Sequence, residues 1–83
     1  MPSEEDIVEK AAEAAEERIF ETYRQSDVSD VDVTVQFIDR ELTVDVYLNA
    51  NAQTPDEQER EQATVEAAID AAERTVDRLV ERE

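Results

Sequence analysis

Apolar residues recur every three or four positions in residues 3–25, which predicts an amphipathic helix. Ser3 stands where a side chain caps the free amides of a first helical turn, and acidic residues follow it at once. The predicted buried face consists of Ile7, Val8, Ala11, Ala12, Ala15, Ile19 and Tyr23. The segment QSDVSD after this helix favours a turn, because serine and aspartate bond to nearby backbone.

Two segments with strict alternation follow, and they predict strands over residues 31–38 and 41–49. A turn at Asp39-Arg40 would set every large apolar side chain of one strand opposite one of the other: Phe37 with Leu42, Val35 with Val44, Val33 with Val46 and Val31 with Leu48. A slip of one residue would destroy these pairs, so the pattern itself predicts the register. The chain has no glycine, and a two-residue turn would hold Arg40 at a strained positive φ, whereas a wider loop would keep the same pairs.

The last segment predicts a helix over residues 55–82. Thr54, Pro55 and Glu57 form a strong start signal, and a narrow apolar stripe runs along the later turns. Before Ala63 there is no apolar residue in this helix, so its first turns are expected to project past the core or to lean on a second subunit.

Together these elements predict one domain over residues 1–83, of the α+β class and of α-β-β-α order. The antiparallel hairpin would be covered on one face by both helices in two layers. A two-stranded sheet leaves two open edges, and a chain of 83 residues has a small core. We therefore predict a homodimer with a four-stranded sheet across it; the alternative is a monomer whose edges are protected by twist and charge.

Two surfaces are candidates for contact with a partner. The outward side chains of the hairpin are polar except for Ile38 and Tyr47, and Thr43 and Asp45 lie beside Tyr47 in the same strand. The second candidate is a flank of the last helix. There Arg74 and Arg78 border small alanines, although an ordinary helical ion pair from Asp70 to Arg74 also explains this pattern.

The charge is extreme, with 24 acidic against 8 basic residues and a formal net charge of −16. Self-repulsion of this size destabilises a compact chain in dilute buffer, and molar salt screens it within about 3 Å. Lys10 is the only lysine, which also suits a salt-rich cytosol. The same charge disfavours nucleic acid as a partner and predicts loosely bound cations over the surface.

The chain lacks histidine, cysteine and glycine, so common catalytic triads, thiolate sites and glycine-rich phosphate loops cannot be built. We therefore expect no cofactor and no catalytic residue. Carboxylates keep two chemical alternatives open. One is a weak divalent-cation site at Asp27, Asp30 and Asp32, and the other is paired-carboxylate catalysis. Neither the beginning of the sequence nor any apolar run resembles a signal peptide or membrane span, so a cytoplasmic protein without membrane contact is expected.

The segments EEDIVEKAAEAAEERIF, DVDVTVQF, ELTVDVYLN and EAAIDAAERTVDRLV together resemble a small archaeal family of unknown function, in a halophilic version. The resemblance implies an α-β-β-α domain in an archaeal cytosol, and it brings no active-site residue. The predicted function is a non-enzymatic accessory or protein-interaction module that binds itself or another protein. The alternative is a carboxylate-based or divalent-cation-dependent enzyme.

Overall fold

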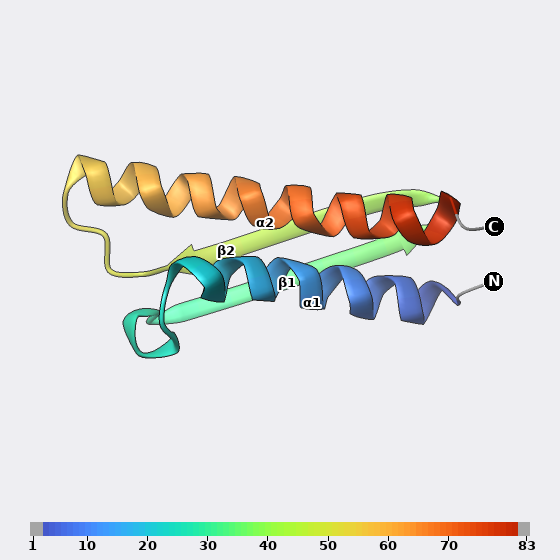
Figure 1. The fold of residues 1–83 in the computed structure, drawn as a ribbon, viewed down its shortest axis with the longest axis horizontal. Helices are drawn as coiled ribbons and strands as arrows, with labels where there is room; N and C mark the ends of the chain where they lie inside the picture. The colour runs from blue at the N-terminus through green and yellow to red at the C-terminus, as the bar shows by residue number, and fades with distance from the viewer. Residues whose placement is uncertain (1–2, 82–83) are drawn as a thin grey trace.

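The computed structural model describes residues 3–81 and shows the predicted order of elements. These are α1 (Glu4–Thr22), a short 3-10 helix η1 (Gln25–Asp27), β1 (Asp30–Ile38), β2 (Glu41–Asn49) and α2 (Pro55–Glu81). The two helices run side by side in opposite directions and cover one face of the hairpin (Figure 1). The hairpin turn lies at the same end of the molecule as the start of α1 and the end of α2.

Helix α1 begins as predicted and ends earlier than predicted. The Ser3 hydroxyl accepts a hydrogen bond from the Asp6 amide at 3.2 Å, which caps the first turn. The predicted helix extends to residue 25, whereas the observed helix ends at Thr22 because Tyr23 has extended backbone with φ −121° and ψ 149°. Its N–H still donates to the Ile19 carbonyl at 3.0 Å, so the last turn is closed before the chain turns into η1.

The hairpin has the predicted register, with β1 beginning one residue before the predicted start. The turn is the tight one: Asp39 and Arg40 have φ of 52° and 64°, so both lie in the left-handed region. Positive φ at both central residues is the type I′ geometry that follows the right-handed twist of two strands. This conformation is sterically unfavourable for arginine, so the pairing of the two strands on either side of the turn must stabilise it.

Helix α2 begins at the predicted proline. The Thr54 hydroxyl accepts from the Glu57 amide at 3.2 Å, and the Glu57 carboxylate accepts from the Gln53 amide at 3.5 Å. Residues 55–60 are exposed, as expected for turns that carry no apolar side chain. The predicted last residue, 82, lies outside the described part of the chain.

The core lies between the helices and the inner face of the hairpin. Helix α1 packs under β1 and α2 under β2, and the two helices pack against each other. Ala11 and Ala15 of α1, and Ala68 and Ala72 of α2, are completely buried. Side chains this small allow two helix backbones to approach closely, and the larger buried residues Ile7, Ile19, Leu48 and Val76 complete the core.

Hydrogen bonds from side chains hold the connection from β2 to α2, which turns without a glycine. Asn51 has φ 58°, and its Oδ1 accepts from the Ser29 hydroxyl at 2.8 Å. The half-buried Ala50 amide donates to a Glu61 carboxylate oxygen at 2.9 Å. Asparagine tolerates the left-handed conformation better than most residues, which lets this connection be short in a chain without glycine.

Candidate functional site

The candidate site is the pair of open edges along the hairpin. Within residues 3–81 the sheet consists of β1 and β2 alone, so each strand has one unpaired side. In a hairpin closed by a two-residue turn, the pair next to the turn, Ile38 and Glu41, is a hydrogen-bonded pair, and such pairs alternate along the ladder. The backbone groups that point outward therefore belong to the alternate residues, whose side chains face the helices.

These inner-face residues are only partly shielded by the helices. Of the inner-face residues of both strands, Leu48 alone is buried, at 5% exposure. The others are half-buried: Val31, Val33, Val35, Phe37, Leu42, Val44 and Val46. By contrast, the helix residues of the core are 0–4% exposed. The apolar layer under the hairpin therefore reaches solvent along both sides of the molecule, beside the free backbone groups.

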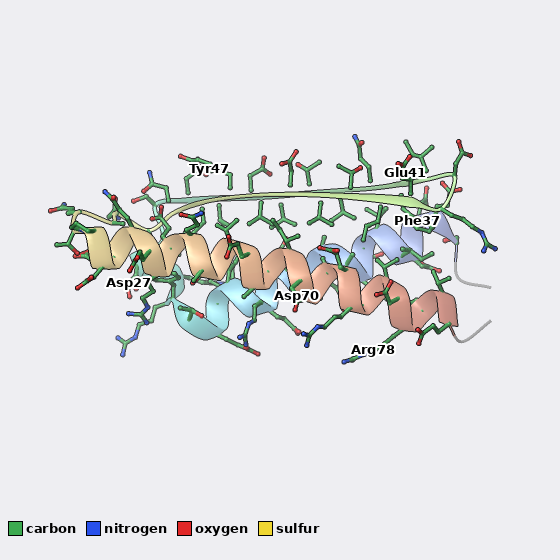
Figure 2. The ribbon with its side chains drawn as sticks, turned by 90° about the horizontal axis from the view of Figure 1, so that it is seen from above. Asp27, Phe37, Glu41, Tyr47, Asp70 and Arg78 are labelled. Atoms are coloured by element: carbon green, nitrogen blue, oxygen red, sulfur yellow. The ribbon has the colours of Figure 1, made fainter. Side chains whose placement is uncertain are left out.

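The outer face of the hairpin carries the sequence-predicted contact residues. Tyr47 and Glu41 project away from the helices (Figure 2). Tyr47 is 54% exposed and Ile38 is 61% exposed, and they are the exposed large apolar residues of the described chain. The structure places Thr43, Asp45 and Tyr47 in sequence along the outer face of β2, while Ile38 lies beside the turn on β1.

The second predicted surface, around Arg74 and Arg78, is a shallow open groove between α1 and α2. Arg78 lies on the helix side of the molecule, pointing away from the hairpin (Figure 2). Ala14, Ala67 and Ala71 line the groove, which has a volume of about 380 Å³. Two of its arginines already have acidic partners on their own helices: Arg74 bonds Asp70 at 3.0 Å and Arg18 bonds Glu21 at 2.9 Å. These exposed pairs match the ordinary helical interpretation of the pattern.

The three aspartates considered for a cation are not brought together. Asp27 lies in η1 on the helix side of the molecule (Figure 2), while Asp30 and Asp32 are exposed positions of β1 that alternate with its inward valines. Across residues 3–81, no cluster of three or more acidic side chains is placed to hold a metal ion. The sequence spacing alone does not determine this, because it does not say on which side of the hairpin each carboxylate falls.

Sequence reasoning missed the contacts that fasten the start of α2 to the end of α1. The Arg60 guanidinium lies over the Tyr23 ring, 5.4 Å from its centroid, and Arg60 Nη2 donates to the Thr22 carbonyl at 3.5 Å. Arg60, Tyr23 and Thr22 line an open depression of about 450 Å³, whose other lining residues include Asp27, Asn51 and Glu57. Arg60 and Thr22 are 38 positions apart, and nothing in the local pattern around either residue signals the contact.

An acidic two-layer α-β-β-α domain with two open sheet edges is the class that fold and site define. Its described helices include none with the length and apolar character needed to cross a membrane. The chain belongs to a family described as "Protein of unknown function (DUF3194)", whose model matches residues 3–79. An uncharacterized protein of the halophilic archaeon Natronomonas pharaonis is 48% identical over 80 residues, covering 96% of this chain and 90% of that protein. No solved structure matches the chain. The predicted resemblance to a family of unknown function is thus confirmed.

Proposed function

We propose that this protein is a non-enzymatic protein-interaction module that binds through an open edge of its hairpin, with a second copy of itself as partner. The observation that carries the proposal lies along the two side walls of the molecule. One side wall is the open edge of β1 with α1 beneath it, and the other is the open edge of β2 with α2 beneath it. Free backbone donors and acceptors lie there beside a row of half-buried apolar side chains. An added strand would use both, because it would bond the backbone and cover the apolar side chains in one step.

The dimensions of a side wall suit a dimer of modest affinity. A strand of nine residues is about 30 Å long at about 3.3 Å per residue, and the molecule is 19 Å thick. Two walls of about 30 by 19 Å would bury on the order of 1,100 Å², near the lower end of specific protein interfaces. The resulting four-stranded sheet would also be more stable than an isolated hairpin.

Charge makes this association depend on salt. Each copy carries a net charge of −16, so a dimer would carry twice that, −32. In dilute buffer this repulsion opposes association, and molar salt reduces its range to about 3 Å. The relative in a halophilic archaeon supports a salt-rich setting for this chain also.

Binding is favoured over catalysis by where the carboxylates lie. The acidic side chains are spread over exposed helix turns and the outer face of the hairpin. The depressions at the groove between the helices, beside Arg60, at the hairpin turn and beside Phe37 are open to solvent, and none of these four encloses a substrate-sized volume. A carboxylate that acts as a general acid needs such an enclosure to raise its pKa, so the exposed arrangement supports a binding role.

Sedimentation equilibrium in about 2 M KCl, over a wide range of protein concentration, tests the proposal. We expect a mass that approaches twice the 9.5 kDa of one chain as concentration rises, and a lower dimer fraction in dilute salt. A mass that stays at one chain throughout would overturn it. A control in sucrose at equal osmolality separates charge screening from a general exclusion effect.

A further inference from the structure

We propose that the two copies join through β2, antiparallel about a two-fold axis that passes beside Val44 or Val46. This inference rests on the proposed function and says which of the two edges is used. The two edges differ in the helix flank beneath them and in the outer side chains that the pairing would bring together.

The flank beneath β2 carries a half-buried apolar side chain outside the core cluster, Ile69. Ile69 is two residues from Ala67 and two residues from Ala71. Two residues turn an α-helix by about 200°, so Ile69 lies about 160° around α2 from each alanine, away from the groove that they line. Since α2 packs under β2, with α1 on the groove side, Ile69 faces the open side below β2. It is half-buried but is not one of the apolar side chains packed against the core.

The corresponding flank beneath β1 is bordered by acid. At that corner Phe37 and Val8 form a shallow apolar depression whose other lining residues are Glu4, Glu5 and Glu9. A two-fold axis along β1 would set two copies of α1 side by side and antiparallel, which would draw these carboxylates into the contact against the later turns of the partner's α1. Pairing through β2 avoids that contact.

Charge on the outer face of β2 then restricts the register. If Asp45 lay on the two-fold axis, it would face the partner's Asp45. If Thr43 lay on the axis, Glu41 would face the partner's Asp45. Like charges directly opposite each other are destabilising, so these two registers are excluded.

Axes at Val44 and Val46 avoid like-charge pairs on the outer face of β2, pair more of the strand than any other axis that does so, and give Tyr47 a partner. With the axis at Val44, Tyr47 lies opposite the partner's Glu41; with the axis at Val46, it lies opposite the partner's Asp45. In both registers the phenol can donate to a carboxylate, and the exposed ring is covered by the neighbouring strand. This accounts for the large apolar residue on the otherwise polar outer face of β2.

The absence of cysteine from the chain allows a direct test with single thiols. Asp45 and Thr34 are paired across the hairpin, and both are exposed on its outer face, so Asp45→Cys and Thr34→Cys are matched variants that differ in strand alone. Asp45 adjoins the axis in both allowed registers, which brings its two copies within reach of a short bis-maleimide linker.

At about 10 μM protein in about 2 M KCl, we expect cross-linking of Asp45→Cys to be about 100-fold faster than that of Thr34→Cys. A thiol held beside its copy has an effective concentration in the millimolar range, whereas Thr34→Cys would depend on random encounters. Val46→Cys and Val33→Cys provide a second comparison of the two strands, by direct disulfide formation between copies, because these inward residues are paired across the hairpin. Disulfide formation in Val44→Cys, compared with Val46→Cys, separates the two registers.

Faster cross-linking through Thr34→Cys or Val33→Cys would overturn the choice of β2 and would leave the dimer proposal standing. A dimeric mass without fast cross-linking at either strand would also overturn it, because the contact would then lie elsewhere. A mass that stays at one chain over the whole range of protein concentration in about 2 M KCl refutes the proposed function itself, so the two failures are distinguishable.

Discussion

The guanidinium of Arg60 lies 5.4 Å from the centre of the Tyr23 ring, so the first exposed turns of α2 are fastened to the C-cap residue of α1. Arg60 also donates to the Thr22 carbonyl at 3.5 Å, one of the last carbonyls of α1 that has no partner within its own helix. Two elements far apart in sequence are thereby joined at the end of the molecule opposite the hairpin turn.

Replacing Arg60 with glutamine is expected to lower the free energy of unfolding by about 0.5–1 kcal/mol, the size of an exposed cation–π contact. Chemical denaturation in about 2 M KCl would measure it. Arg24→Gln is the matched control, because Arg24 is exposed one residue beyond Tyr23. A double-mutant cycle with Tyr23→Leu should give a coupling energy of similar size, and additive effects would show that the contact contributes nothing.

Replacing Arg40 with glycine is expected to raise the free energy of unfolding by about 0.5–1 kcal/mol. The gain arises because glycine adopts φ 64° without steric cost, and part of it is lost to the greater freedom of the unfolded chain. Arg78→Gly, in the last turns of α2, should instead lower stability by about 1 kcal/mol. Equal and negative effects at both sites would contradict the type I′ turn.

Enlarging the alanines between the helices is expected to be costly. Ala15→Leu or Ala68→Leu should each lower stability by about 1–3 kcal/mol, because a larger side chain forces the helices apart. Ala67→Leu is the control, since Ala67 borders the open outer groove and should change stability by less than about 0.5 kcal/mol. Tolerance of leucine at Ala68 would mean that the helices do not meet closely there.

Stability should rise with KCl between about 0.1 M and 2 M, as screening shortens from about 10 Å to a few Å. Part of this dependence should be removable on α1, where Glu9, Glu13 and Glu16 are exposed neighbours three or four positions apart. Replacing all three with glutamine should stabilise the protein at low salt by about 0.5–1 kcal/mol, since like-charge pairs cost about 0.2–0.5 kcal/mol each. The gain should vanish in about 2 M KCl; a gain that persists there would point to helix propensity instead.

Millimolar Mg²⁺ or Ca²⁺ in constant high KCl is expected to leave the melting temperature unchanged, because the surface carboxylates bind cations loosely and the KCl already screens them. Thermal melting followed by circular dichroism checks this. A saturable, ion-specific rise that is lost in Asp27→Asn or Asp32→Asn would favour the divalent-cation alternative.

Much of the fold could be predicted from the sequence because local patterns carry it. The alternation around Asp39-Arg40 predicts the register found in the structure, and the signals at Ser3 and Thr54 predict both helix starts. The predicted end of α1 was wrong by three residues. The serine and aspartate residues after the helix favour several turn geometries, and tertiary contacts select one of them. The first turns of α2 gave no sign that Arg60 would reach Tyr23.

The sequence by itself determined which residues are apolar, how they are spaced, and therefore which face of each element is buried. It also determined the net charge of −16, from which we predict that stability depends on salt. Only the tertiary structure decided that the helices leave both side walls of the hairpin half-covered, and that Asp27, Asp30 and Asp32 do not gather. These are relations between elements. They depend on where whole helices and strands come to rest against one another, which periodicity within a single segment does not encode.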